Sequence, residues 1–142
     1  MRRPVAVLRL IDVNANRALE GARVCEEVAR FVLQSASSCR RLRSLRHDIA
    51  QAVGSLPIST TSLLRARATR RDPGRRAPSG SVGSLERLLL VNFQRTKEAL
   101  RMLEECARLA APSHAARFQA LRFQAYDRER ECLLRVAALP RP

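Results

Sequence analysis

The chain has 142 residues, of which 46% are hydrophobic and 28% are charged, and its formal net charge is +14. This length allows one domain with a core of ordinary size, and the composition is typical of a folded protein rather than a disordered one. The longest apolar runs are far shorter than the ~20 residues of a membrane span, and charged residues interrupt the N-terminal segment, so we expect a soluble, cytoplasmic protein without membrane contact.

The spacing of apolar residues predicts two long helices in the first part of the chain. The first helix is expected to run from about Asp12, which would cap it, to about Gln34. Residues 35–38, which begin with Ser35, are expected to form a turn and cap. The second helix then carries apolar residues at spacings of three and four and is expected to end at Gly54.

Residues 55–83 form a connector rich in Pro, Gly and Arg. Ser59 is expected to cap a short helix within this connector, and the stretch 70–80 is expected to be an exposed loop because Pro and Gly punctuate it.

The third and fourth long helices follow the connector. Ser84 is expected to cap the third helix, which would continue to about Ala110, and 112–113 would open the fourth, which Pro140 would stop. The fourth helix carries apolar residues at every seventh position, namely Phe118, Ala125, Cys132 and Leu139.

No segment of useful length alternates with period two, so we expect an all-α fold. The predicted architecture is a single-domain helical bundle that consists of two helical hairpins, 12–54 and 84–139, joined by the connector 55–83. The hairpins are expected to be related by an internal pseudo-two-fold axis, because part of the first returns in the second.

The repeat consists mainly of polar residues. Segments 14–30 and 92–108 are identical at eight paired positions, and seven of these are charged or amide residues. In the first copy the eight residues are Asn14, Arg17, Glu20, Arg23, Glu26, Glu27, Ala29 and Arg30. Several apolar positions differ, such as Val24 against Met102. A repeat kept for packing alone would preserve its apolar face, so these polar groups indicate binding or chemistry.

At about 100° per residue, five polar residues of each copy form a narrow stripe on the helix. The stripes are Asn16, Glu20, Arg23, Glu27 and Arg30, and Gln94, Glu98, Arg101, Glu105 and Arg108. The small residues Gly21 and Ala99 occupy equivalent positions and predict a close crossing of the two helices, which would bring the stripes together over a shared hollow. The alternative is that the stripes are solvated ion pairs worth about 0.2–0.5 kcal/mol each.

A hollow lined by guanidinium and carboxylate groups suits phosphorylated ligands. Arg binds phosphate oxygens through paired, charge-assisted hydrogen bonds, and carboxylates hold Mg²⁺. Phosphoryl transfer requires these parts and little covalent chemistry, although the chain has neither a Walker loop nor a kinase Gly-rich loop. His47, next to Asp48, is a candidate for acid–base chemistry or phosphate contact, and the alternative is a structural or exposed histidine.

The high positive charge also raises the question of nucleic acid binding. Only one of the 27 basic residues is a Lys, a skew that GC-rich coding also produces, and stacking aromatics are scarce. Small anionic ligands explain the charge equally well, so nucleic acid is not the favoured partner. The four cysteines lie far apart without metal-ligand spacing and are expected to be small buried residues.

The polar blocks resemble a known family. Residues 10–31 are similar to the opening block of the monofunctional hydroxymethylpyrimidine phosphate kinases of thiamin biosynthesis, small domains found alone or fused to thiamin phosphate synthase. The sequence Leu-Arg-His-Asp at 45–48 resembles their middle motif, and 92–105 resembles their second block. The resemblance extends over roughly 8–135. One departure lies in the connector, where 75–78 reads Arg-Arg-Ala-Pro instead of an acidic residue followed by a Val-Gly step, which leaves open a diverged or inactive member.

The resemblance implies transfer of phosphate from ATP, with Mg²⁺, to the monophosphate of 4-amino-5-hydroxymethyl-2-methylpyrimidine. The product would be the diphosphate that thiamin phosphate synthase couples to a thiazole. The implied partners are therefore the pyrimidine phosphate and ATP, with the synthase as a neighbouring or fused protein. A homodimer stays open.

The repeat and the resemblance together give each polar residue a role in this hypothesis. The catalytic candidates are Arg17, Glu20, Arg95, Glu98 and His47. The phosphate-binding candidates are Arg23, Arg101, Arg46 and Arg71. The substrate-binding candidates are Asn14, Asn16 and Asn92, and the candidates for Mg²⁺ are Glu20, Glu27, Glu98 and Glu105.

Two alternatives belong to other classes of protein. The first is a non-catalytic helical module that binds an anionic partner such as nucleic acid, or that scaffolds thiamin phosphate synthase, and the basic connector favours it. The second is a purely structural bundle whose stripes face solvent.

Overall fold

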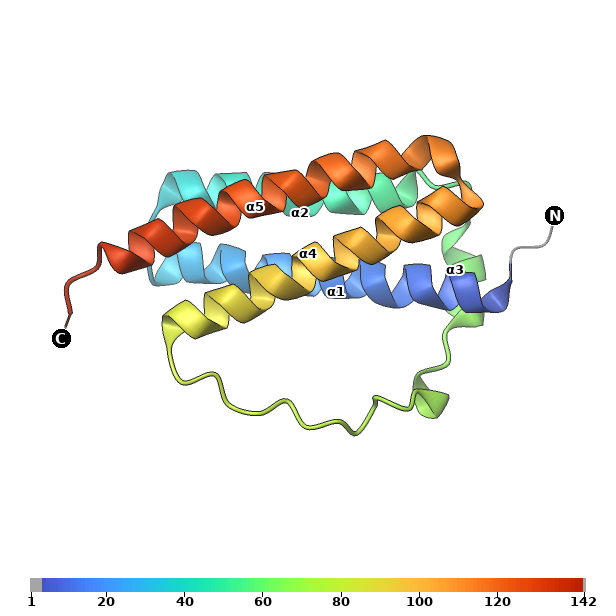
Figure 1. The fold of residues 1–142 in the computed structure, drawn as a ribbon, viewed down its shortest axis with the longest axis horizontal. Coiled ribbons are helices and arrows are strands. Elements are labelled where there is room, and N and C mark those ends of the chain that lie inside the picture. Colours follow the sequence, from blue (N-terminus) through green and yellow to red (C-terminus); the bar gives the residue numbers. More distant parts are fainter. Residues whose placement is uncertain (1–3, 142) are drawn as a thin grey trace.

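The computed structural model, which describes residues 4–141, is a bundle of four long helices (Figure 1). The long helices are α1 (Val5–Phe31), α2 (Ala36–Gly54), α4 (Leu85–Ala110) and α5 (Ala115–Ala137). The shorter elements are α3 (Thr60–Ala66) and the 3₁₀ turns η1 (Thr69–Arg71) and η2 (Pro112–His114). The described part of the chain contains no strand, so the all-α prediction is confirmed.

The helices are arranged so that α1 contacts both α2 and α4, and α5 contacts both α4 and α2. The two helices that carry the repeat, α1 and α4, run in opposite directions and cross each other on one side of the bundle (Figure 1). The connector runs beneath these two helices in Figure 1, from α3 at one end of the bundle to the start of α4 at the other. Its residues 70–80 are all exposed, as predicted, although η1 occupies the first two of them.

Serine side chains fix the starts of three helices, as the sequence predicts. The hydroxyl oxygens of Ser35, Ser59 and Ser84 accept hydrogen bonds from the backbone amides three residues later, at 3.2, 3.1 and 3.0 Å. These bonds satisfy amides that have no partner within their own helix, which is why serine is favoured there.

The first helix begins earlier than expected. It starts at Val5, so the prediction that Asp12 caps it is wrong. Val7 and Ile11, one helical turn apart, are buried in the larger core, and this burial favours the additional turns. Asp12 lies within the helix, is 7% exposed, and accepts hydrogen bonds of 2.7 and 2.8 Å from the guanidinium of Arg67.

Two predicted helix ends are also displaced. The first helix ends at Phe31 rather than Gln34, whose φ of 50° lies in the left-handed region. The fourth begins with the turn η2, and α5 ends at Ala137, so Leu139 lies beyond it and is 41% exposed. The seven-residue spacing therefore marks core positions only at Phe118, Ala125 and Cys132.

The core consists of two groups of buried side chains. The larger group joins all four long helices, and the smaller one surrounds Cys25, Leu42 and Phe93. All four cysteines are free thiols, and three of them are buried, as the sequence predicts. Within residues 4–141, no helix is both long and apolar enough to cross a membrane.

Candidate functional site

The helices α1 and α4 are in close contact at Gly21. A Cβ atom added to Gly21 would lie 2.5 Å from Thr96 Oγ1 and 2.7 Å from the carbonyl oxygen of Asn92, so no larger residue fits without a shift. Ala99, the residue equivalent to Gly21 in the second copy, is fully buried. The predicted close crossing of the repeated helices is therefore confirmed at Gly21.

A groove of about 900 Å³ lies between α1 and α4. From α1 it is lined by Leu10, Asn14, Arg17, Glu20, Gly21 and Val24, and from α4 by Asn92, Arg95, Glu98, Ala99 and Met102. Each of the α4 residues stands 78 positions after one of the α1 residues, so the two copies of the repeat contribute equivalent residues to the groove. The volume is near the upper end of the range for small-molecule sites, about 300–1,000 Å³.

The charged side chains of this groove are largely unpaired. Arg17, Glu20 and Arg95 make no hydrogen bond or ion pair with any other residue among 4–141. Glu98 accepts one hydrogen bond of 2.9 Å from the Nε2 amide of Gln94. These groups are therefore available to a ligand, and the two guanidiniums are of the kind that binds phosphate and carboxylate oxygens.

The two asparagines are held in the same way. Asn14 donates from Nδ2 to the carbonyl oxygen of Leu10 at 2.8 Å, and Asn92 donates to that of Leu88 at 2.9 Å. Each bond fixes which side of the carboxamide is the donor, so the Oδ1 atom of each is turned away from its own helix backbone. The two copies thus present equivalent acceptor atoms.

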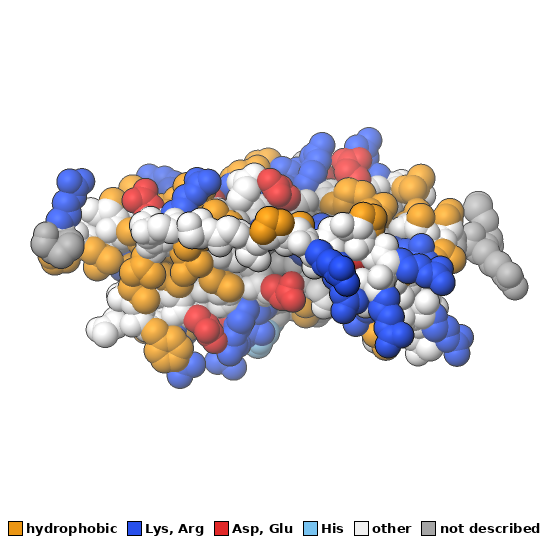
Figure 2. Space-filling view, turned by 90° about the horizontal axis from the view of Figure 1, so that it is seen from below, with side chains coloured by type: hydrophobic (Ala, Val, Ile, Leu, Met, Phe, Trp, Pro, Cys, Tyr) orange, Lys and Arg blue, Asp and Glu red, His pale blue; other side chains and the backbone are white. Residues whose placement is uncertain are grey.

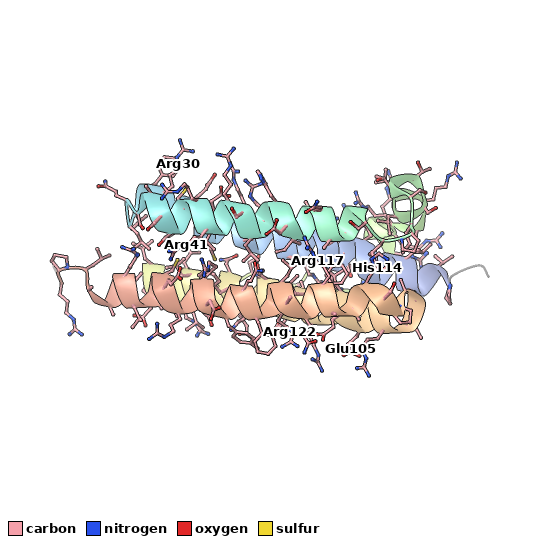
Figure 3. The ribbon with its side chains drawn as sticks, turned by 90° about the horizontal axis from the view of Figure 1, so that it is seen from above. Arg30, Arg41, Glu105, His114, Arg117 and Arg122 are labelled. Atoms are coloured by element: carbon pink, nitrogen blue, oxygen red, sulfur yellow. The ribbon has the colours of Figure 1, made fainter. Side chains whose placement is uncertain are left out.

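Most of the predicted stripe lies outside the groove. Arg23 pairs with Glu27 on α1 at 3.3 Å, and Arg101 pairs with Glu105 on α4 at 3.4 Å, all with partly or largely exposed side chains. Apart from Glu20 and Glu98, the remaining members of the stripes also lie outside the groove, and in Figure 3 Arg30 and Glu105 extend outward on opposite sides of the bundle.

Of the two stripes, therefore, the structure places only Glu20 and Glu98 in the groove. The helices cross at their small residues. The side chains that face the groove therefore lie roughly 120° around each helix from the predicted stripe. The residues of this line that the sequence analysis did not select are Leu10, Val24 and Met102. The sequence does contain a pattern that indicates this line, because Asn14, Arg17, Gly21 and Val24 are spaced three, four and three residues apart and so share one face of the helix.

Two identical glutamates of the repeat have a structural role. Glu26 is 6% exposed and accepts hydrogen bonds of 2.8 and 3.4 Å from Arg46 of α2. Glu104, its equivalent, is 7% exposed and accepts bonds of 3.3 and 3.0 Å from Arg122 of α5. The polar residues of the repeat therefore have two different roles: some line the groove, and others form ion pairs that join neighbouring helices.

Four further candidates also lie away from the groove. Arg46 is engaged by Glu26, while His47 is exposed on the outer side of α2 and Arg71 is exposed in η1. Asn16 is exposed and donates its amide to the carbonyl oxygen of Asp12 at 3.0 Å. The structure therefore does not bring these candidates together with the groove residues.

A divalent cation would find two carboxylates in the groove, Glu20 and Glu98, because Glu27 and Glu105 are paired elsewhere. Within the described residues, no group of three or more His, Cys, Asp or Glu side chains gathers into a metal cage. Mg²⁺ usually takes one or two carboxylates and completes its shell with water and phosphate oxygens. The groove therefore fits Mg²⁺ that arrives with a phosphorylated ligand.

Figure 2 views the bundle from the side of the connector, where acidic side chains lie among basic ones and the basic side chains gather toward the α3 end.

Comparisons with known proteins give one family match and several relatives. The model of the ThiD2 family matches residues 9–131. The chain is 39% identical over 136 residues to a thiamine-phosphate synthase of Rhodopirellula baltica, 36% over 126 residues to one of Nostoc punctiforme, and 38% over 128 residues to one of Synechococcus sp.. These matches cover 94%, 87% and 89% of this chain but 36%, 34% and 35% of the relatives, so the chain spans about a third of their length. No solved structure matches.

Proposed function

The chain belongs to the ThiD2 family, and we propose that it acts in thiamin biosynthesis as a kinase. The proposed reaction adds a phosphate from ATP to the monophosphate of 4-amino-5-hydroxymethyl-2-methylpyrimidine. The observation that carries the proposal is the groove between α1 and α4, in which Arg17 and Arg95 are unpaired beside Glu20 and Glu98. The relatives named thiamine-phosphate synthase support the pathway.

The two unpaired arginines would bind the phosphates of both substrates. A guanidinium that has no carboxylate partner gains most from a phosphate, because paired charge-assisted hydrogen bonds then replace contacts with water. Arg23 and Arg101 differ in this respect, since each is already paired on its own helix. An acceptor without a phosphate would leave one groove arginine unpaired, which gives selectivity for the monophosphate.

In the proposed reaction an oxygen of the acceptor phosphate attacks the γ-phosphorus of ATP. The new P–O bond forms as the bond from the γ-phosphorus to the bridging oxygen breaks, and its electron pair leaves on ADP. The second pKa of a phosphate monoester is about 6, so the acceptor is mostly a dianion at neutral pH and needs no general base. The position of His47 outside the groove is consistent with this chemistry.

Arg17 and Arg95 would stabilise the charge that develops on the transferred group, and they would hold the reacting oxygens in line. Glu20 and Glu98 are the groove residues that would hold Mg²⁺, whose contribution when bound is to neutralise phosphate charge.

The test measures diphosphate formation by purified protein with ATP, Mg²⁺ and the pyrimidine monophosphate. Arg17→Met and Arg95→Met should each lower kcat/KM by about 10²-fold or more, as the loss of one transition-state donor does. Arg23→Met and Arg101→Met are matched controls on the same helices and should stay within about threefold, because exposed pairs contribute little. Absence of diphosphate from wild-type protein with an intact helical circular dichroism spectrum would reject the proposal.

A second candidate function is non-catalytic binding of an anionic partner, or scaffolding of thiamin phosphate synthase. The exposed connector favours it, because Arg70, Arg71, Arg75 and Arg76 lie there with a single Asp among them. This function predicts that Arg75→Glu and Arg76→Glu weaken binding to nucleic acid, with a strong salt dependence, while substitutions at Arg17 and Arg95 do not. The kinase proposal predicts the opposite order for the pyrimidine phosphate.

A further inference from the structure

The register of the two helices determines which groove residues lie at its centre and which lie at its ends. Thr96 bonds to the carbonyl oxygen of Ala18, and Gly21 lies against both Asn92 and Thr96. Because α1 and α4 are antiparallel (Figure 1), this register places Arg17 level with Glu98, and Arg95 level with Glu20. Two guanidiniums and two carboxylates therefore surround the middle of the groove.

The ends of the groove have a different character. Asn14 and Asn92 lie at opposite ends, separated by roughly 14 Å along the helices at 1.5 Å per residue. The same register places an apolar residue of the opposite helix level with each asparagine, Met102 with Asn14 and Val24 with Asn92. Each end thus combines one amide with an apolar wall, the usual composition of a site for a flat heterocycle.

The orientation of the two amides adds a chemical requirement. One hydrogen of each Nδ2 is donated to the carbonyl oxygen four residues earlier, and the Oδ1 on the other side of the amide can accept from a ligand N–H. Adenine and the aminopyrimidine acceptor share one recognition element, an amino group on the pyrimidine ring next to a ring nitrogen. Two equivalent acceptors at the two ends match two ligands that carry this same donor.

We propose that the groove binds the nucleotide and the pyrimidine phosphate head to head. Each base lies at one end with its amino group donating to an asparagine Oδ1, and the two phosphate groups meet among Arg17, Glu20, Arg95 and Glu98. This arrangement rests on the proposed kinase function. It also explains the internal repeat, because two ligands with similar bases can be bound by two similar half-sites.

Differences between the ends assign the ligands. The Asn14 end has two apolar lining residues, Leu10 and Met102, whereas the Asn92 end has only Val24. The residue equivalent to Leu10 in the second copy, Leu88, does not line the groove. The larger apolar surface suits the purine of ATP, so the nucleotide base lies at Asn14 and the smaller pyrimidine lies at Asn92.

The test uses isothermal titration calorimetry with each ligand separately, the β,γ-imido analogue of ATP and the pyrimidine monophosphate. Asn14→Leu should weaken binding of the ATP analogue at least tenfold and leave the pyrimidine phosphate within twofold. Asn92→Leu should do the reverse. Equal losses of both ligands in both variants would overturn the two-ended arrangement, and an exchanged pattern would overturn the assignment of the ends.

A second measurement needs no substitution at the asparagines. Inosine triphosphate, which carries an oxygen in place of the adenine amino group, should bind the wild-type protein at least tenfold more weakly than ATP. Val24→Phe should block the pyrimidine phosphate and leave the ATP analogue unaffected. Equal binding of the two triphosphates would overturn the role of Asn14, whichever variants fold.

Failure of this arrangement is distinguishable from failure of the kinase proposal. Wild-type protein that forms the diphosphate without the crossed pattern of binding losses would retain the activity and lose the two-ended arrangement. Wild-type protein that forms no diphosphate would lose the activity itself, and the arrangement that depends on it would fall too.

Discussion

Thr96 and Ala18, which occupy equivalent positions in the two copies of the repeat, are joined by a hydrogen bond of 3.1 Å from the threonine hydroxyl to the alanine carbonyl oxygen. Both residues are fully buried, so the bond satisfies a hydroxyl that would otherwise lack a partner in the core. This contact marks the crossing of α1 and α4, and it fixes how the two helices are rotated relative to each other. The position and lining of the groove follow from that rotation.

Gly21→Ala should destabilise the protein, contrary to the usual effect in a helix, where this change stabilises by about 1 kcal/mol. The added methyl group would lie 2.5 Å from Thr96 Oγ1 and 2.7 Å from the Asn92 carbonyl oxygen. Overpacking of this kind typically costs about 1–3 kcal/mol. Urea unfolding measures the change. Gly54→Ala is the matched control, because an added Cβ meets nothing within 4 Å there, and its stability should be unchanged or higher.

Glu104→Gln should lower the free energy of unfolding by about 2 kcal/mol, the usual scale of a hydrogen bond to a charged group. The change leaves the Arg122 guanidinium, whose side chain is 12% exposed, without its carboxylate. Glu26→Gln should behave alike because Arg46 makes the equivalent contact. The control is Glu27→Gln, whose pair with Arg23 is about half exposed and worth at most ~0.5 kcal/mol. Similar losses at Glu27 and Glu104 would contradict the structural role of the buried glutamate.

The buried thiols should make the protein less stable at high pH. Burial raises the pKa of Cys132 from 9.0 to about 11, and burial, followed by the influence of Cys132 and Glu129, raises the pKa of Cys25 as well. In the unfolded chain these thiols ionise near their ordinary pKa, so the stability they contribute is complete below pH 9 and is lost as the pH rises from 9 toward 11. The midpoint of urea unfolding should fall over this window.

Labelling with a thiol reagent provides a separate check at pH 8. Cys39 is half-buried and should react in the native protein, whereas Cys25 and Cys132 should react only after urea is added. A variant with Cys25→Ala and Cys132→Ala should show a shallower decline of stability above pH 9. An unchanged slope would assign the pH effect to other groups.

Asp12→Asn should loosen the connector without unfolding the bundle. The Asp12 carboxylate accepts two hydrogen bonds from Arg67, which directly follows α3, and Arg9 donates to the carbonyl oxygen of Ala66 at 2.7 Å. Loss of the carboxylate should speed hydrogen exchange in 60–71, measured by mass spectrometry, while exchange in α5 stays slow. Asp127→Asn, an exposed substitution on α5, is the control. Unchanged exchange in 60–71 would show that Arg9 alone holds this segment.

The sequence predicted the helical elements well because their signals are local. Serine caps act within three residues of a helix start, and apolar spacing reports which face of a helix is buried, so Ser35, Ser59 and Ser84 were found without knowledge of the fold. Asp12 shows the limit of this reasoning. It has the chemistry of a cap, but burial of Val7 and Ile11 extends the helix past it, and its actual partner lies 55 residues away.

The equivalent polar residues of α1 and α4 and the close contact at Gly21 could be inferred from the chain alone, because a duplicated pattern and a small residue are visible in it. The packing of the helices was needed to show that Arg17 and Arg95 line the groove, while Arg23 and Arg101 pair at the surface and Glu26 and Glu104 bind arginines of other helices. The physical reason is that a helical wheel gives the angle between side chains on one helix. The rotation of that helix against its neighbours depends on contacts such as that of Thr96 with Ala18, which form only when distant segments pack together.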